Sequence, residues 1–443
     1  MRTLVKKFIP RKLFRRIEPF GHLCEAILLN TLAGFPSRNL KVIGVTGTNG
    51  KTTTAFMIHR MLQNAGYKTG LMTTVAYGIG EDIKPQMTHM TTSSVPVLLK
   101  RFKAMKDAKV DWLVLETTSH ALAQHRVWSV PYSVSVLTNI THEHVNYHGT
   151  FERYVAAKRM MFTQTNLNRR GLRTGIINGD DPNASVFAQA IDKPILYGVD
   201  NASLRATSIK LKPTGIEYDA VHGDQTYHIT SKLPGSFNLY NSLAAVGVGE
   251  VLGLTKEQIE QGIAALEGVE GRMTHIDEGQ DFSVIVDYAH TPDSFEKLFA
   301  DMRPVVKGRL IVLFGSLGGG DETKRAIQGE LAGTYADDVI VTEEDNRTED
   351  PARIMTMIAE GVERKGKERD KDLFIIPSRR EAIRFVMLRA KKNDTVLLLG
   401  KGHEKTIEDA NGAHPWNEIE EAHAALRMML SKAKILHPKN KKK

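Results

Sequence analysis

Short apolar runs and longer amphipathic segments alternate along the chain from Leu40 onward. The apolar runs are rich in Val, Ile and Leu, which is typical of strands buried in a parallel sheet, and the segments between them are long enough for covering helices. In the first half, the predicted strands are Lys41–Val45, Asp111–Glu116, Val134–Asn139 and Thr174–Asn178. In the second half, they are Phe282–Tyr288, Leu310–Phe314, Asp338–Val341, Leu373–Ile376 and Thr395–Leu399.

The two alternations are separated by residues 268–272, which have the composition of a linker. Before this linker, a patch richer in Gly, Thr and Tyr (about 203–232) predicts antiparallel hairpins, and a helix is expected to begin near Asn238. The pattern therefore predicts an α/β protein in three parts. They are a basic N-terminal segment at 1–38, a central domain with a mainly parallel sheet at 39–270, and a C-terminal Rossmann-like α/β domain with a basic tail at 271–443.

A glycine-rich turn follows the first predicted strand, in the sequence VIGVTGTNGKTTT at Val42–Thr54. Small residues there let backbone N–H groups face a polyphosphate, and the N-terminus of the next helix adds its positive dipole end. Lys51 supplies a point charge, and Thr52 or Thr53 supplies a hydroxyl for Mg²⁺. Because Val45 stands where the commoner pattern has glycine, this loop is of the shorter GTNGKT type. A purely structural turn is the alternative, and the GKT ending disfavours it. The central domain is thus predicted to be a P-loop ATPase domain.

Polar residues also follow the next two predicted strands. Glu116 ends one of them, at the sheet edge where open α/β proteins bind ligands, and is therefore a candidate metal ligand. The other runs into Thr138–His144, with His148 shortly after. Three histidines could bind zinc, but no helical HExxH spacing accompanies them, so a single histidine beside a magnesium carboxylate is the preferred interpretation.

The segment FERYVAAKRMMF at Phe151–Phe162 predicts a helix that carries Tyr154 and Lys158 on one face. Most such lysines are only solvated. A lysine whose amine is kept neutral can instead react with CO₂ to form a carbamate, which is an oxygen ligand for Mg²⁺.

In the second alternation, Asp287–His290 closes a strand, Thr291 is the expected helix cap and Pro292 the first helical residue. Three later loops also follow apolar strands: Gly315–Lys324, Glu343–Pro351 and Gly400–Glu404. Together they predict a second binding edge that faces the first, with ATP between them.

The composition of the chain indicates the cellular compartment in which we expect it. Cys24 is the only cysteine, so no intrachain disulfide is possible, which fits a reducing cytoplasm. Apolar runs fall short of the roughly 20 residues that span a bilayer, and Glu25 and Asn30 interrupt the stretch where a secretory signal would have its apolar core. We expect a soluble cytoplasmic protein with no nucleic acid partner.

The formal net charge is +9, and much of it lies at the two ends of the chain. The basic residues near the start are Arg2, Lys6, Lys7, Arg11, Lys12, Arg15 and Arg16, and those near the end are Lys439 and Lys441–Lys443. Leu, Ile and Phe interleave with the first group, which could form an amphipathic helix in peripheral contact with the inner face of a membrane. The alternative is a solvated basic face whose apolar side packs on the next domain.

These residues, in this order, resemble the Mur ligase family over roughly Leu40 to Ala410, and most closely the branch that adds the third amino acid of the peptidoglycan stem peptide. The stretches that carry the resemblance are TGTNGKTTT, ETTSHALAQHRV, TNITHEHVNYHGTFERYVAAKRMMF, PGSFNLYNSLAA, GRM, DYAHTPD and GKGHE. The family implies an ATP-dependent carboxylate–amine ligase: a substrate carboxylate attacks the γ-phosphate, and an incoming amine captures the acyl phosphate. This chemistry asks the protein for positioning and charge neutralisation.

The resemblance also implies roles for individual residues. ATP would contact Gly47, Thr48, Asn49, Gly50, Lys51, Thr52, Thr53, Asn238, Asn241, Arg272, Asp287 and His290. Two Mg²⁺ ions would be held by Thr53, Glu116, His144 and carbamylated Lys158, and the catalytic residues would be Lys51, Glu116, His144 and Lys158. A muramoyl-peptide acceptor would contact Thr91, Thr92, Thr118, Gln124 and Arg126. The incoming amino acid would contact Arg325, Asp345, Asn346, Arg347, Gly400 and Glu404.

The sequence departs from the family at two places. Only some forty residues precede the phosphate loop, where the family has an N-terminal domain of about a hundred residues that binds the UDP part of the substrate. The amino-acid selector of the family is usually Asp-Asn-Pro-Arg, and here it is Glu344-Asp345-Asn346-Arg347, so diaminopimelate and lysine both remain open.

The predicted function is therefore an ATP-dependent ligase of peptidoglycan synthesis, with roles in cell-wall biogenesis, cell shape and cell division. Two alternatives stay open. One is a ligase of the same superfamily with another acceptor, such as a lipid-linked muramoyl peptide, folate or a polyamino acid. The other is a non-catalytic nucleotide-binding scaffold, which would require the loss of a residue such as Lys51, Glu116, His144 or Lys158, and all four are present.

Overall fold

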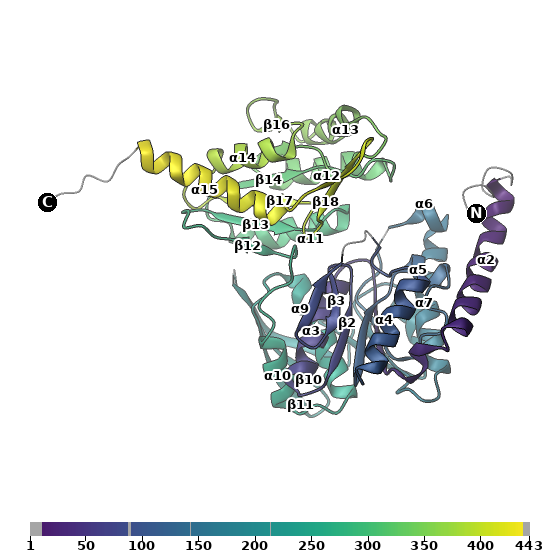
Figure 1. The fold of residues 1–443 in the computed structure, drawn as a ribbon. Coiled ribbons are helices and arrows are strands. Elements are labelled where there is room, and N and C mark those ends of the chain that lie inside the picture. Colours follow the sequence, from purple (N-terminus) through teal and green to yellow (C-terminus); the bar gives the residue numbers. More distant parts are fainter. Residues whose placement is uncertain (1–10, 87–89, 142, 213, 437–443) are drawn as a thin grey trace. The chain divides into compact units, whose positions relative to one another are not determined.

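The computed structural model describes residues 11–86, 90–141, 143–212 and 214–436, and for 11–17, 145–146 and 432–436 it describes the backbone only. The chain divides into two compact units (Figure 1). Unit 1 comprises residues up to Lys232 together with Phe237–Glu267, and unit 2 comprises Leu233–Ser236 and Gly268 onward.

Unit 1 is built on one sheet with the strand order β11-β10-β9-β8-β7-β6-β1-β5-β2-β3-β4. From β9 to β2 neighbouring strands run parallel, and the hairpins β2–β4 and β9–β11 extend the sheet antiparallel at its two ends. Its strands are β1 (Val42–Thr46), β2 (Thr69–Met72), β3 (Ala76–Ile79), β4 (Asp82–Pro85), β5 (Trp112–Glu116), β6 (Tyr132–Leu137), β7 (Thr174–Asn178), β8 (Lys193–Gly198), β9 (Leu204–Lys212), β10 (Gly215–His222) and β11 (Gln225–Ser231).

Helices cover this sheet and close the core of unit 1. They are α2 (Arg11–Leu32), η1 (Pro36–Asn39), α3 (Lys51–Asn64), α4 (Val95–Asp107), α5 (Ser119–Ala123), α6 (Val145–His148), α7 (Phe151–Leu167), α8 (Ala184–Ala188), α9 (Ser236–Val251) and α10 (Lys256–Ala264). Strands β1, β5, β6 and β7 are buried at every position, which is why their sequences are continuous apolar runs rather than alternating ones.

Unit 2 has a second sheet with the order β12-β13-β17-β14-β15-β16, parallel apart from β12. Its strands are β12 (Thr274–Ile276), β13 (Ser283–Asp287), β14 (Leu310–Phe314), β15 (Asp338–Val341), β16 (Leu373–Ile375) and β17 (Thr395–Leu399), and a separate hairpin pairs β18 (Thr406–Asp409) with β19 (Gly412–Pro415). Its helices are α11 (Pro292–Met302), η2 (Arg303–Val305), α12 (Thr323–Tyr335), α13 (Pro351–Glu363), α14 (Arg379–Arg389) and α15 (Glu418–Leu436).

The α/β class predicted from the sequence is confirmed, including its mainly parallel sheets. Each phosphate or polar loop of the sequence follows the carboxyl end of a parallel strand: the phosphate loop follows β1, and Glu116 is the last residue of β5. In unit 1, β1 lies between β5 and β6, so the loops after these three strands are brought together at one edge of the sheet. The candidate site of unit 1 lies at this edge of the sheet.

Candidate active site

The phosphate loop is shaped by two glycines that have positive φ. Gly47 has φ 150°, and a Cβ there would lie 1.9 Å from Thr138 Oγ1. Gly50 has φ 81°, and a Cβ there would lie 2.3 Å from Asn241 Oδ1. Any side chain at either place would be strained in φ and would collide with these atoms, so glycine keeps the loop backbone accessible at the N-terminus of α3.

The loop is braced by the residues that follow β6. Asn139 Oδ1 accepts a hydrogen bond from the Asn49 backbone N–H at 2.9 Å, and the Asn49 carbonyl accepts from Asn139 Nδ2 at 3.1 Å and from Thr138 Oγ1 at 2.6 Å. Lys51 is the first residue of α3, and its Nζ donates to the Thr48 carbonyl at 2.6 Å. The loop is therefore held in the cradle conformation by the protein itself.

Glu116 joins the phosphate loop to the loop after β2. Its side chain is 1% exposed, and Oε2 accepts from Thr52 Oγ1 at 3.0 Å and from the Thr74 N–H at 2.9 Å. Oε1 accepts from Thr74 Oγ1 at 3.0 Å. The hydroxyl beside the expected metal-binding carboxylate is thus that of Thr52, although the resemblance placed this role on Thr53. A buried carboxylate with an adjacent threonine hydroxyl at a phosphate loop is a donor set that fits Mg²⁺.

Lys158 lies in the interior of unit 1, with 2% of its surface exposed. Its Nζ donates to the Gly47 carbonyl at 2.6 Å and lies 4.7 Å from the centre of the Tyr154 ring. Burial first, and then the positive charge of Lys51, hold the pKa of Lys158 well below its ordinary value. The neutral amine is the form that can react with CO₂.

Imidazole and phenol rings gather beside this lysine. The His120 ring lies 4.6 Å from that of His144 and 5.5 Å from that of His148, and His148 Nε2 lies 3.0 Å from Ser119 Oγ. Burial lowers the pKa of His120 to about 3 and that of His148 to about 4, so both are neutral near pH 7. His144 has φ 56° and is 41% exposed. His142 lies outside the described residues.

The residues expected to contact the acceptor form one hydrogen-bonded group that reaches Glu116. Thr74 Oγ1 bonds to Thr91 Oγ1 at 2.9 Å, Thr92 Oγ1 donates to the Glu116 carbonyl at 3.1 Å, and the Thr118 N–H donates to Thr92 Oγ1 at 3.1 Å. Arg126 Nη1 donates to the Thr92 carbonyl at 2.8 Å, and Arg126 Nε donates to Gln124 Oε1 at 2.9 Å. The structure thus connects these five residues, which are separated in the sequence.

The residues expected to contact the nucleotide lie in both units. In unit 1, Asn241 Oδ1 accepts from Thr54 Oγ1 at 3.1 Å, and Asn241 Nδ2 donates to Asn238 Oδ1 at 3.0 Å. Both asparagines are buried on α9, and Asn241 also limits position 50 to glycine.

In unit 2, the guanidinium of Arg272 lies 4.5 Å from the centre of the Tyr288 ring, and the ring of His403 lies 4.9 Å from the same ring. His290 Nδ1 lies 2.9 Å from the Tyr288 carbonyl. Burial raises the pKa of Asp287 and the charge of Arg272 opposes this rise. Tyr288 organises this group, although the sequence reasoning gave it no role.

The residues expected to select the amino acid surround a buried lysine that the sequence reasoning missed. Lys401 is fully buried, and its Nζ lies 2.8 Å from Asp345 Oδ1 and 2.6 Å from Glu404 Oε2. Gly400 and Asn346 are buried beside it. A Cβ on Gly400, whose φ is 99°, would lie 2.5 Å from Glu344 Oε2. Lys401 is part of the GKGHE stretch, so its position in a motif was the available signal.

The two arginines of this set differ in their surroundings. Arg325 is fully buried and donates from Nη1 and Nη2 to the Glu349 carboxylate at 2.7 and 2.8 Å, so its fork already has a carboxylate partner. Arg347 is 43% exposed and has φ 54°, and its Nε donates to Glu408 Oε2 at 3.3 Å. Of the two, Arg347 is the one that presents donors to solvent.

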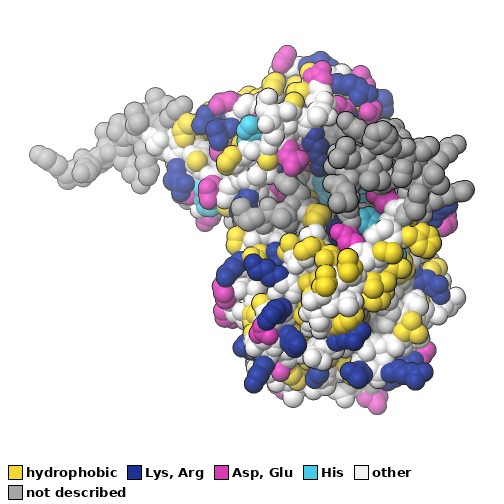
Figure 2. Space-filling model, turned by 45° about the vertical axis from the view of Figure 1, so that its right-hand side comes forward, with side chains coloured by type: hydrophobic (Ala, Val, Ile, Leu, Met, Phe, Trp, Pro, Cys, Tyr) yellow, Lys and Arg dark blue, Asp and Glu magenta, His cyan; other side chains and the backbone are white. Residues whose placement is uncertain are grey.

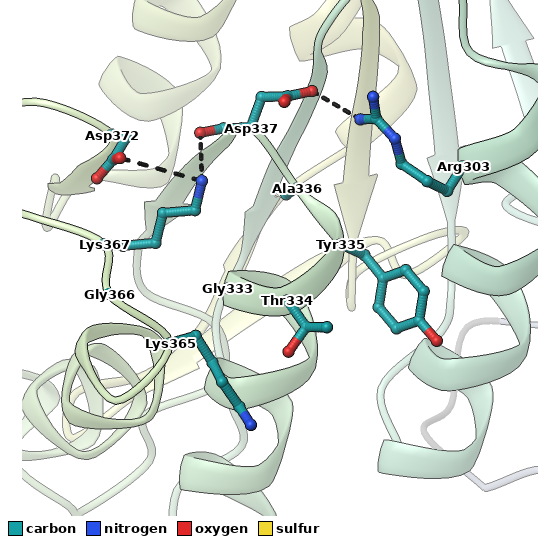
Figure 3. Close-up of a pocket in the computed structure, with 10 residues that line it drawn as sticks. All are labelled: Arg303, Gly333, Thr334, Tyr335, Ala336, Asp337, Lys365, Gly366, Lys367 and Asp372. Carbon is teal, nitrogen blue, oxygen red and sulfur yellow. Dashed lines mark hydrogen bonds and ion pairs between the residues drawn. The ribbon is translucent and has the colours of Figure 1, made fainter.

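A cavity of about 420 Å³ in unit 2 does not include any of these residues (Figure 3). It lies where α12 ends and β15 begins, at the amino edge of the sheet. Arg303 Nη1 lies 2.7 Å from Asp337 Oδ2, and Lys367 Nζ donates to the Asp337 carbonyl at 2.9 Å (Figure 3). Arg303 and Lys367 therefore already have partners within the lining of this cavity, and we assign it no ligand.

Comparison with known proteins defines the class of protein to which this site belongs. The family model described as "Mur ligase middle domain" matches residues 45–249, and that described as "Mur ligase, glutamate ligase domain" matches residues 271–402. The chain belongs to the Mur ligase family. It is an ATP-dependent ligase of the type that joins an acid to an amino acid.

Particular relatives narrow the position of the chain within the family. A UDP-N-acetylmuramyl-tripeptide synthetase of Roseiflexus sp. is 38% identical over 420 residues, which cover 92% of this chain and 82% of the relative. A UDP-N-acetylmuramoyl-L-alanyl-D-glutamate–2,6-diaminopimelate ligase of Clostridium botulinum is 37% identical, covering 86% and 76%.

Solved structures with a similar fold include members of the same family. A 2,6-diaminopimelate ligase of the same name is similar with a TM-score of 0.61 and 29% identity, over 90% of this chain and 81% of that one. A folylpolyglutamate synthase of Mycobacterium tuberculosis has a TM-score of 0.66 at 18% identity, over 85% of this chain and 92% of that one, which shows the shared fold alone.

Proposed function

We propose that this ligase adds an amino acid to a muramoyl-peptide acceptor, as one step in the synthesis of a peptidoglycan precursor. The observation that carries the proposal is the chain of hydrogen bonds from Thr52 through Glu116 and Thr74 to Thr91. It connects the phosphate loop to the residues expected to hold the acceptor, so that the γ-phosphate and the acceptor carboxylate would meet beside one buried charge.

The reaction then has two steps. A carboxylate oxygen of the acceptor attacks the γ-phosphorus, the bond to the β,γ-bridging oxygen breaks, and ADP leaves. The neutral amine of the amino acid attacks the acyl carbon of the acyl phosphate, and phosphate leaves as the amide forms and the amine loses a proton. The backbone of Gly47–Gly50 and the Lys51 charge stabilise the negative charge that develops on the transferred phosphoryl group.

Mg²⁺ would neutralise phosphate charge, and we propose Thr52 or Thr53, Glu116, His144 and carbamylated Lys158 as the residues that hold two ions. The proposal for Lys158 is supported by its burial and its lowered pKa. As a carbamate it would carry a negative charge and oxygen ligands in place of an amine. Its Nζ is already within hydrogen-bonding distance of the phosphate loop at Gly47.

The names of the relatives make diaminopimelate the first amino acid to test, with lysine the second. The acceptor could carry UDP, as in those names, or a lipid, and folate or a polyamino acid are further alternatives. A cytoplasmic location belongs to the same proposal.

The direct test is to incubate the protein with ATP, Mg²⁺, each candidate acceptor and a panel of amino acids, and to identify ligated products by mass spectrometry. The proposal expects a product whose mass equals that of acceptor plus amino acid minus water, formed only with a muramoyl-peptide acceptor. Product with folate or a glutamyl peptide instead would overturn the acceptor class. ATP binding with no product from any pair would favour the scaffold.

A further inference from the structure

The N-terminal helix α2 has two faces that both carry apolar side chains. One face packs on unit 1: Ala26 is fully buried, and Asn30 is 1% exposed, with its Nδ2 donating to the Ala26 carbonyl at 2.8 Å and its Oδ1 accepting from Ser129 Oγ. Leu29 is partly buried against the same core. This face accounts for the attachment of the helix to its own domain.

The opposite face of α2 is apolar and exposed. Phe20 is 69% exposed, Leu28 59% and Leu32 76%, and Ile27 lies between them at 39%. Figure 2, which brings the side of unit 1 with α2 forward, shows hydrophobic side chains gathered in one exposed patch there. A surface helix normally places polar residues on the face away from the core, so this face has the character of a binding surface.

The sequence continues the same pattern toward the start of α2. Leu13, Phe14 and Ile17 precede Phe20 at the three- and four-residue spacing of one helical face. Basic residues accompany them in the sequence: Arg11 and Lys12 come before Leu13, and Arg15 and Arg16 come between Phe14 and Ile17. The described part of the row runs from Phe20, which follows Pro19 inside the helix, to Leu32, and is therefore about three turns long.

The charge of this region indicates what covers the row. No Asp or Glu precedes Glu18, whereas Arg2, Lys6 and Lys7 add to the basic residues of the helix. The two acidic residues of α2, Glu18 and Glu25, both lie near His22, at 3.8 and 3.9 Å from its ring nitrogens. An exposed apolar face that follows a strongly basic stretch of sequence complements a lipid surface that has anionic headgroups and an apolar interior.

Among the described helices, none combines the length and the apolar character needed to cross a bilayer. We propose that α2 lies in the plane of an anionic membrane surface, with the exposed row from Phe20 to Leu32 in the headgroup region and the basic stretch of sequence before it supplying the attraction to anionic lipid. The inference concerns an interaction surface and stands apart from the ligase reaction. Its failure would leave the proposed function unchanged.

Co-sedimentation of the full-length chain with vesicles tests this proposal. The protein is expected to sediment with vesicles of equal phosphatidylglycerol and phosphatidylcholine at low salt, to bind pure phosphatidylcholine much more weakly, and to lose most binding at high salt. Absence of binding to the anionic vesicles at low salt would overturn the proposal.

The double variant Phe20→Glu with Leu28→Glu places two charges on the exposed row. It should bind the anionic vesicles roughly 100-fold more weakly, because it loses two large apolar groups and gains two repelled charges. The matched control is Leu388→Glu, a leucine of unit 2 that is 55% exposed on α14, and this variant should bind like the unchanged protein. Equal binding by the double variant and the control would contradict the proposal.

Two measurements in the absence of vesicles test whether the exposed row instead binds a second copy of the chain or packs within the protein. Light scattering should show the same oligomeric state for the unchanged protein and the double variant, and their melting temperatures should agree. A dimer that the double variant dissociates would assign the row to a second copy of the chain. A lower melting temperature confined to the double variant would show that the row packs within the protein, and either result would overturn the membrane proposal.

Discussion

At the scale of single residues, the site depends on groups held in unusual states by their neighbours. Lys158 is an amine in the protein interior, and Glu116 is a buried carboxylate whose partners are hydroxyl and amide donors in the described structure. Both would be costly if they served only the fold, because buried charged groups need compensation. In the proposed function, ATP and metal ions bound at the phosphate loop provide this compensation.

Replacing Lys158 with alanine should reduce the ligation rate by about 100-fold or more, because the variant lacks the group proposed to ligate Mg²⁺ as a carbamate. Added formate or acetate should restore part of the rate by supplying a carboxylate. The unchanged protein should show a carbamate signal by ¹³C NMR in ¹³CO₂-enriched buffer, and Lys158→Ala should lack it. Full activity of the variant without added carboxylate would show that Lys158 has a structural role.

Arg347→Lys should raise the KM for the amino acid about tenfold while leaving the KM for ATP nearly unchanged, since lysine cannot reproduce the bidentate contact of a guanidinium with a carboxylate. Arg364→Lys is the matched control, because Arg364 follows α13, is 57% exposed and pairs with Glu330. Steady-state kinetics with each substrate varied in turn provide the measurement. Equal effects on both constants would mean that the loop of Arg347 is structural.

At the scale of elements, the proposed ATP site depends mainly on the conformation of the turn between β1 and α3. Gly50 is the last residue of this turn, directly before α3, and Gly66 follows the end of the same helix with φ 90° and open space around its Cβ position. Comparing alanine variants at these two positions therefore distinguishes the effect of backbone strain from the effect of blocking the phosphate loop.

Gly66→Ala should destabilise the protein by about 1–2 kcal/mol, the cost of the left-handed conformation for alanine, and Gly50→Ala should destabilise it by at least as much. Only Gly50→Ala should also weaken ATP binding, by about 100-fold, because its methyl group must displace Asn241. Thermal unfolding and titration with a fluorescent ATP analogue measure the two effects. If Gly50→Ala bound ATP as tightly as Gly66→Ala does, the assignment of this turn to phosphate binding would fail.

The elements that the sequence predicted best are those with continuous apolar runs. Strands β7, β14, β15 and β17 begin and end where the sequence placed them, because buried parallel strands leave a clear signal. Strand β2 (Thr69–Met72), in contrast, is short, contains a glycine and left no such signal. Its pairing with β5, Met72 beside Leu115, is what brings Thr74 to Glu116, so that contact could not be predicted without the register.

At the scale of the whole molecule, the account combines family membership with a site described in two separate units. The phosphate loop, Glu116 and the acceptor group belong to unit 1, and the amino-acid group around Lys401 belongs to unit 2. In the proposed reaction, both sets of residues act on the same acyl phosphate. The central claim is therefore that the phosphoryl group passes through the acceptor carboxylate.

Isotope transfer tests this claim most directly. An acceptor labelled with ¹⁸O in its reacting carboxylate is ligated with ATP and the amino acid, and the phosphate released is analysed by mass spectrometry, with Lys51→Ala as a control that should neither ligate nor release phosphate. The account predicts that each phosphate formed with product carries one ¹⁸O atom from the acceptor. Product formation accompanied by unlabelled phosphate would contradict it.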